Sequence, residues 1–243
     1  MQAKNKILIP VDLAKFVLKE KISNLFAFYL LIQKYSNGKL KKDSSLINRL
    51  SQELEVDKRT IRNYFKKAIQ RDFIGFDEKS KICFVRSINH IFKKYNLNNL
   101  QCAVFNYSDI TLLKYFLFAC VIANLNRNQG VRLVSNEHSK GRSKQKEIYP
   151  YYSVSVETLC DILSLSPGTI SNYKLAAFRY QFINLCKIFF QYKGSIVDAE
   201  FLNKYCKKAK TYFHINNKTI WGQASDFIES CVEIKKGKNL NHK

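Results

Sequence analysis

Apolar residues recur at helical spacing in two consecutive stretches near the middle of the first half of the chain. Leu46, Ile47, Leu50 and Leu54 recur at helical spacing, and the apolar positions from Ile61 to Ile69 continue with the same period. Between the two stretches, Asp57 offers a side-chain oxygen that can cap a helix. This pattern predicts a helix, a short turn and a second, longer helix, which is the helix-turn-helix arrangement.

The same segment occurs a second time. Residues 50–74 and 159–183 align without a gap at an offset of 109 residues, and nine of the 25 positions carry the same residue. The shared positions include the pattern Thr-Ile-x-Asn-Tyr at the start of the second helix, and Ser166-Pro167 takes the capping place of Asp57. The repeat therefore predicts two helix-turn-helix units.

A pair of short β-prone runs follows each copy. After the first copy, Ile74–Phe76 and Lys81–Arg86 flank a polar turn, and after the second, Ile188–Tyr192 and Ser195–Val197 are arranged in the same way. A hairpin after a helix-turn-helix is the wing of a winged helix. We therefore expect a mainly α protein with small β-wings, of α+β class, built from two tandem winged helices.

The expected domain boundaries follow from these elements. A strongly apolar helix is predicted before each copy, over residues 24–35 and 110–125. We expect a first winged helix over residues 1–96, a second over 97–197 with a basic insertion at 127–149, and a helical C-terminal extension with a basic tail over 198–243.

The charge balance indicates the class of partner. Lysine and arginine number 41 against 19 aspartates and glutamates, which gives a formal net charge of +22. A chain this basic is typical of proteins that bind polyanions, so nucleic acid is favoured over an anionic membrane surface or a solvated surface without a partner. Most aromatic residues fall in apolar stripes, which favours duplex DNA over single strands or RNA.

In its layout, residues 1–197 resemble the tandem winged-helix proteins that initiate plasmid replication, and more loosely replication and regulatory proteins of phages and mobile elements. The likeness consists of two winged helices, a long apolar helix before each pair, and strong basicity. It implies sequence-specific binding of duplex DNA and initiation of replication of a plasmid or mobile element. The alternatives are a transcriptional regulator of a phage or mobile element and a non-catalytic protein-interaction module.

Candidate DNA-binding side chains gather on one face of the second helix of the first copy. Polar and basic residues there fall within about 140° of one another, opposite the apolar stripe. Arginine can contact guanine, asparagine and glutamine can contact adenine, and lysine neutralises phosphate; the Thr60 hydroxyl is expected on a backbone phosphate. With two lysines of the wing, the set is Arg59, Thr60, Arg62, Asn63, Lys66, Lys67, Gln70, Lys79 and Lys81.

The equivalent face of the second copy is nearly uncharged, and two interpretations stay open. Either Ser171 and Asn172 read bases while lysines and the basic insertion hold phosphates, which we favour, or Leu175 and Ala176 are buried against a partner protein. The insertion itself is either a flexible arm along the DNA or a solvated loop. The candidate residues are Thr169, Ser171, Asn172, Lys174, Lys140, Arg142, Lys144 and Lys146.

The sequence contains no pattern typical of catalysis or metal binding. No two of the four histidines lie within about 20 residues of each other, the seven cysteines lack zinc-site spacing, and the carboxylates are dispersed. No enzyme activity, metal, cofactor or small-molecule substrate is expected. Apolar runs fall short of the ~20 residues of a membrane span and no signal peptide is predicted, so we expect a cytoplasmic protein away from the membrane. Candidate protein partners are a second copy of the chain and replication or transcription machinery.

Overall fold

The computed structural model describes residues 5–98, 101–138, 152–186, 189–192, 212–216, 219–223 and 227–236. It confirms a mixed α+β protein with open, three-stranded sheets. The chain separates into two compact units, of which one combines Met1–Val121 with Val232–Lys243 and the other is Ile122–Cys231.

The first unit contains most of the helices. Its elements are β1 (Lys6–Pro10), α1 (Val11–Lys19), α2 (Ser23–Tyr35), β2 (Lys39–Lys41), α3 (Ser44–Glu53), α4 (Lys58–Gln70), β3 (Ile74–Asp77), β4 (Ile82–Val85), α5 (Ile88–Lys94), β5 (Gln101–Asn106), the 3-10 helix η1 (Tyr107–Leu112), the start of α6 (Leu113–His138), and β12 (Ile234–Lys236).

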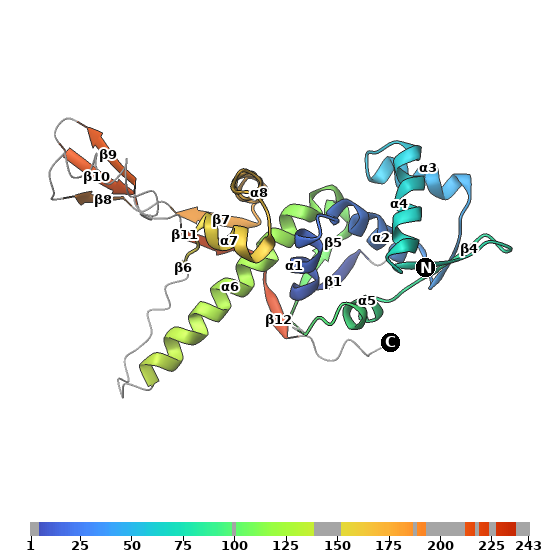
Figure 1. Ribbon diagram of the computed structural model, residues 1–243, viewed down its shortest axis with the longest axis horizontal. Coiled ribbons are helices and arrows are strands. Elements are labelled where there is room, and N and C mark those ends of the chain that lie inside the picture. The colour runs from blue at the N-terminus through green and yellow to red at the C-terminus, as the bar shows by residue number, and fades with distance from the viewer. Residues whose placement is uncertain are drawn as a thin grey trace. The chain divides into compact units, whose positions relative to one another are not determined.

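Helix α2 forms the core of this unit. Every residue from Leu25 to Ile32 is buried, as expected of a helix that is apolar on all sides. The Phe28 ring meets the Phe65 ring of α4 edge to face with centroids 4.9 Å apart, and the Tyr29 ring lies 5.4 Å from that of Phe73. These contacts fix α4 against α2 and leave the opposite face of α4 outward (Figure 1).

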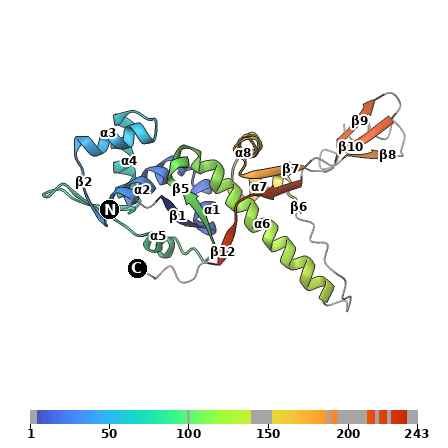
Figure 2. The same ribbon diagram turned by 180° about the vertical axis from the view of Figure 1, so that it is seen from behind.

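Two small antiparallel sheets complete the first unit. In one, β4 lies between β2 and β3, with Gly75 opposite Phe84, which confirms the hairpin expected after the first helix-turn-helix. In the other, β5 lies between β1 and β12, so that Ile234 pairs with Ala103 from more than a hundred residues earlier in the chain (Figure 2). This second sheet was not expected from the sequence.

The second unit repeats the order of elements of the first. After the remainder of α6 come β6 (Tyr152–Ser153), α7 (Val156–Leu163), α8 (Pro167–Arg179), β7 (Ile183–Cys186), β8 (Phe189–Tyr192), β9 (Tyr212–Asn216), β10 (Thr219–Gln223) and β11 (Phe227–Ser230). Helix α8 and strand β7 begin and end 109 residues after α4 and β3, the offset of the sequence repeat.

The sheet of the second unit also has the same order as its counterpart. β11 lies between β6 and β7, as β4 lies between β2 and β3. The difference is in the connection, since about 40 residues separate β7 from β11 and include a further sheet with the order β8-β10-β9.

The structure also differs from the expectations for the second half of the chain. Strand β8 pairs with β10, and the expected hairpin partner of β8, Ser195–Val197, lies outside the described residues. A helical extension was expected over 198–243, but the regular elements in its described part are strands β9 to β12; residues 198–211 lie outside the described part. The first part of the expected basic arm, residues 127–138, is the uninterrupted end of α6, since no proline breaks that helix; residues 139–149 lie outside the described part.

The η1 and α6 segment is unusually apolar. Tyr107–Asn128 is long and apolar enough to cross a membrane by length and composition, with a mean hydropathy of 1.5, and 56% of its most apolar stretch is buried inside the protein. From Phe116 to Ala123 no side chain is more than 9% exposed. Because protein covers the segment, it is compatible with a core helix of a soluble protein.

Candidate nucleic-acid interface

Helix α4 is fixed at its first turn by a side-chain cap. The Asp57 carboxylate accepts hydrogen bonds from the Thr60 backbone N–H at 2.7 Å and from the Thr60 hydroxyl at 2.9 Å. These bonds lower the pKa of Asp57, because they favour its ionised form. The Thr60 hydroxyl already donates a hydrogen bond to the capping residue Asp57. The expected contact of this hydroxyl with a phosphate therefore competes with that bond.

The two faces of α4 differ sharply in chemistry. Ile61, Phe65 and Ala68 are fully buried against the core. The opposite face is solvent-exposed and contains no acidic side chain; its exposed members are Arg59, Arg62, Asn63, Lys66, Lys67 and Gln70. Arg59, Thr60, Arg62, Asn63 and Lys66 together line a shallow, open hollow on this face. The structure thus brings five of the residues predicted on this helix to one hollow.

An ion-pair cluster holds the C-terminal end of α4 in place. Asp72 has a left-handed backbone, with a φ of +55°, and receives hydrogen bonds from Arg86 Nε at 3.1 Å and Lys94 Nζ at 3.3 Å, while His90 Nε2 lies 3.0 Å from its Oδ2. The bond from His90, followed by those from Arg86 and Lys94, lowers the pKa of Asp72 to about 2. The cluster ties the residue after α4 to β4 and α5.

The β3–β4 turn presents two more of the predicted residues. Lys79 and Lys81 are both exposed there, and Asp77 stabilises the turn by accepting a hydrogen bond from the Lys79 backbone N–H at 3.2 Å. The Lys81 backbone is left-handed, with a φ of +57°. These lysines therefore lie at the tip of a defined hairpin.

Basic residues of β2 join this surface and were missed in the sequence. Lys39 and Lys41 are exposed on the strand that pairs with β4, and Lys39 Nζ lies 5.7 Å from the centroid of the exposed Phe84 ring. Lys42 Nζ lies over the rings of Phe65 and Phe76, at 5.0 and 5.3 Å. The alternation Lys-Leu-Lys at positions 39–41 is the signal that identifies the strand.

Helix α8 carries the second predicted set. Ser166 caps it, accepting a hydrogen bond from the Thr169 backbone N–H at 3.3 Å, and the two hydroxyl groups are 2.9 Å apart. Asn172 is exposed, whereas Thr169, Ser171 and Lys174 are half-buried. Lys140, Arg142, Lys144 and Lys146, the rest of this set, lie outside the described residues.

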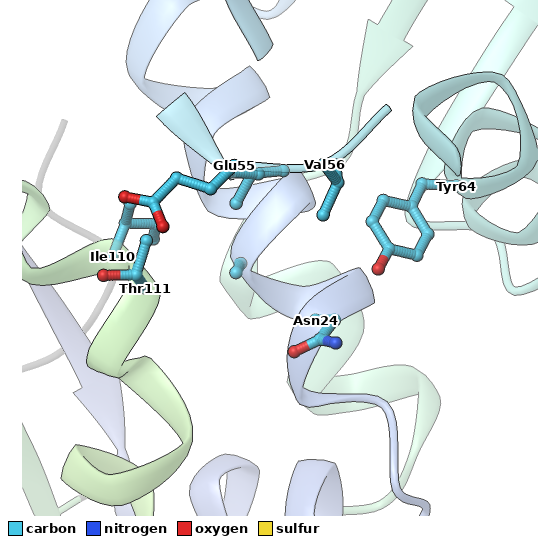
Figure 3. Close-up of a pocket in the computed structure, with 8 residues that line it drawn as sticks. Asn24, Glu55, Val56, Tyr64, Ile110 and Thr111 are labelled. Atoms are coloured by element: carbon cyan, nitrogen blue, oxygen red, sulfur yellow. The ribbon is translucent and has the colours of Figure 1, made fainter. Parts of the chain in front are cut away.

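A pocket of about 190 Å³ lies behind α4, on the side away from the basic face. Its lining comes from α2, the α3–α4 turn, α4 and η1, and Figure 3 shows the Tyr64 hydroxyl directed toward Asn24 and the Glu55 carboxylate on the far wall. Tyr64 thus points from α4 toward the core side. In the described part of the chain no three histidine, cysteine or carboxylate side chains gather where they could hold a metal ion.

Comparison with other proteins yields no match: no protein-family model, curated protein or solved structure matches this chain. The function is therefore argued from the site itself.

Proposed function

We propose that the chain binds duplex DNA sequence-specifically, with α4 as the recognition helix of a winged helix. The observation that carries the proposal is the outer face of α4, where Arg62, Asn63 and Lys66 are exposed together with no acidic neighbour on the helix. Arginine and asparagine form bidentate hydrogen bonds with guanine and adenine edges, and lysine neutralises phosphate. Such a mixture serves base recognition better than a uniform lysine surface does.

The elements around α4 support this assignment. A recognition helix enters the major groove while the neighbouring elements contact the backbone. Lys79 and Lys81 at the hairpin tip, with Lys39 and Lys41 on β2, supply cations on the sheet beside the helix. In this proposal the β3–β4 hairpin is the wing.

The second unit is proposed to be a second winged helix. In support, α7, α8 and β7 follow one another as α3, α4 and β3 do, and the strand order β6-β11-β7 corresponds to β2-β4-β3. On this basis the β8-β10-β9 sheet is inserted in the wing, and the strand that closes the motif is β11. Two such units on one chain would contact two neighbouring segments of DNA.

The biological role we propose is initiation of replication of a plasmid or mobile element in the cytoplasm, without catalysis. The tandem layout and the net charge of +22 support it. The partner is double-stranded DNA, with a second copy of the chain or the replication machinery acting on the bound complex.

Salt dependence of binding tests the proposal. If about six phosphates are contacted, the logarithm of the affinity for duplex DNA should fall with the logarithm of the salt concentration at a slope near −5. Lys66→Ala and Lys67→Ala together should reduce the steepness of the slope by about two, whereas Lys15→Ala with Lys19→Ala on α1 should leave it unchanged. A slope near zero for the natural chain would overturn the proposal.

Selection of bound sequences from random duplex DNA then tests the role. Short repeated sites beside an A·T-rich stretch in the source replicon support initiation. A single palindrome over a promoter would replace initiation by transcriptional regulation.

A further inference from the structure

Helices α4 and α8 are built alike on their buried sides. Both have 13 residues and both are capped by the side chain of the preceding residue, Asp57 or Ser166. Ile170 and Ala177 of α8 are fully buried, as their counterparts in α4 are. A left-handed residue follows each helix, Asp72 in one case and Gln181 in the other. The two helices are therefore equivalent in position within their units.

The outer face of α8 lacks most of the positive charge of the outer face of α4, although Arg179 takes the place of Gln70. Where α4 has Arg59, Arg62, Lys66 and Lys67, the repeat places Gly168, Ser171, Leu175 and Ala176 on α8. Every long cationic side chain is replaced by a short or apolar one. The asparagine between them is unchanged, since Asn63 corresponds to Asn172, and both are exposed.

Leu175 lies at the centre of this altered face. Its side chain is 54% exposed, and by helical spacing it lies one turn after Asn172 and Ser171. Leu175 does not stand alone, because the side chain of Phe178, three residues later, is 48% exposed as well. Leu175 takes the position that Lys66 has in the first unit. It lies next to the Asn172 amide, which can contact a base.

The chemistry of the face matches an A·T base pair. Asparagine forms two hydrogen bonds with adenine N6 and N7, and an apolar side chain contacts the thymine C5-methyl group. Arg179, the one cation on this face, lies in the last turn, about 16 Å along the axis from Gly168. Arg179 lies one turn beyond Leu175 at the C-terminal end of the helix, the end that contacts the DNA backbone in some recognition helices, so Arg179 is placed for a phosphate.

The short side chains also set the depth of approach. A Cβ added at Gly168 would meet no atom of the described residues within 4 Å, so the space next to this position is open. With serine and alanine at the positions of Arg62 and Lys67, the helix axis can lie closer to the base edges than α4 can. Contact between a leucine and a methyl group requires such an approach, because dispersion acts only near 4 Å.

Charge favours DNA over a protein partner for this face. Residues 122–231 contain fifteen lysines and arginines against eight aspartates and glutamates, and α8 has no acidic side chain. We infer that α8 reads A·T base pairs, with Leu175 on thymine methyl groups and Asn172 on adenine, while α4 reads the guanine-containing part of the site. This inference rests on the proposed DNA binding.

Replacement of thymine by uracil isolates the methyl contact, because uracil lacks only the C5-methyl group. With the full chain and its selected duplex, uracil in the part covered by the second unit should weaken binding about fourfold for each contacted methyl, which corresponds to about 0.8 kcal/mol. Leu175→Ala should weaken binding to the thymine duplex by a similar factor and remove the sensitivity to uracil. The exposed position of Leu175 favours a folded variant, which circular dichroism checks.

Lys66→Ala, at the equivalent position of α4, is the matched control. This variant should weaken binding to the thymine and uracil duplexes by the same factor, so that the ratio of the two affinities stays that of the natural chain. Duplex binding that is insensitive to uracil, or a Leu175→Ala variant that keeps the natural sensitivity, would overturn the inference. The role of α4 would be unaffected by that result, and a protein contact would become the favoured role of the outer face of α8. Absence of salt-dependent duplex binding by the natural chain would overturn the proposed function as well.

Discussion

Asp72 Oδ1 accepts a hydrogen bond from Arg86 Nε at 3.1 Å, and this contact joins the turn after α4 to the residue that follows β4. His90 and Lys94 of α5 approach the other carboxylate oxygen. One half-buried acid thus fixes the direction in which the basic helix and its neighbouring hairpin leave the core.

Replacing Asp72 by asparagine should lower the free energy of unfolding at pH 7 by about 1 kcal/mol, since partly exposed ion pairs are screened by solvent. The pKa of Asp72 falls from 3.8 to about 2 on folding, so the carboxylate stabilises the fold above pH 4 and loses this contribution as the pH falls toward 2. Urea unfolding of both proteins from pH 7 to 2 measures the difference. Glu78→Gln, on an exposed turn residue, is the control, and a difference that stays constant down to pH 2 would contradict the prediction.

Single substitutions on α4 should separate base recognition from phosphate binding. Arg62→Ala or Asn63→Ala should cost about 1–3 kcal/mol of affinity for the selected site and relax the sequence preference, because contacts to base edges are lost. Lys67→Ala should weaken binding to all sequences alike. Competition titrations with selected and scrambled duplexes measure both effects. If Ser171 and Asn172 substitutions change the preference and those on α4 do not, α8 is the main recognition helix.

The cap of α4 should be replaceable by the cap of its repeat. Asp57→Ala removes the acceptor of two hydrogen bonds and should lower the melting temperature by about 3 °C. Asp57→Ser should retain the natural melting temperature, because Ser166 caps α8 in the same geometry. The serine variant also removes a negative charge next to Arg59, so its affinity for duplex DNA at low salt should rise. Equal instability of the two variants would show that the carboxylate charge, and not the hydrogen bond, stabilises the helix.

Tyr29 should contribute to stability through its hydroxyl group. The side chain is fully buried and donates a hydrogen bond to the Arg86 carbonyl at 2.7 Å, which Gln33 Nε2 also reaches at 3.2 Å. Tyr29→Phe should therefore lower the free energy of unfolding by about 1 kcal/mol, because the Arg86 carbonyl keeps one of its two donors. Burial raises the pKa of Tyr29, so the natural protein should lose this advantage above pH 10, where the unfolded tyrosine ionises first. Denaturant titrations at pH 7 and above 10 test both statements. The Tyr64 hydroxyl faces an open pocket, so the control Tyr64→Phe should change the free energy of unfolding little.

The local elements of both units could be predicted from the sequence. The bounds of α4 and α8 follow from a capping residue, an apolar stripe of period 3.6 and a turn residue after the last helical turn, and all three signals lie within about 15 residues. The exposed face of α4 could be predicted as well, because it lies opposite the apolar stripe that is buried against the core. The first hairpin was predictable for the same reason, since β3 and β4 are neighbours in sequence.

The long-range pairings were not predictable in this way. β11 and β12 are short strands of four and three residues, and nothing in Phe227–Ser230 indicates that its partners lie at Ile183–Cys186 and Tyr152–Ser153. The run Phe189–Tyr192 has the pattern of a hairpin strand, but strand pairing depends on which partner is available, and Thr219–Gln223 supplies it. The helical extent of α6 beyond residue 125 was not predicted, because the charged residues that follow favour an exposed loop.

The central place of β11 has a consequence for the order in which the protein forms. β6 and β7 each pair with β11 and not with one another, and β12 comes a few residues later to complete the sheet of the first unit. The sheet of the second unit therefore waits for β11 to leave the ribosome, whereas the first unit then lacks only the edge strand β12. Closing such distant pairs is slow, so α7 and α8 should exist for a time without a finished sheet, and ribosome-bound chains stalled before Phe227 should be cut by protease in the second unit before the first.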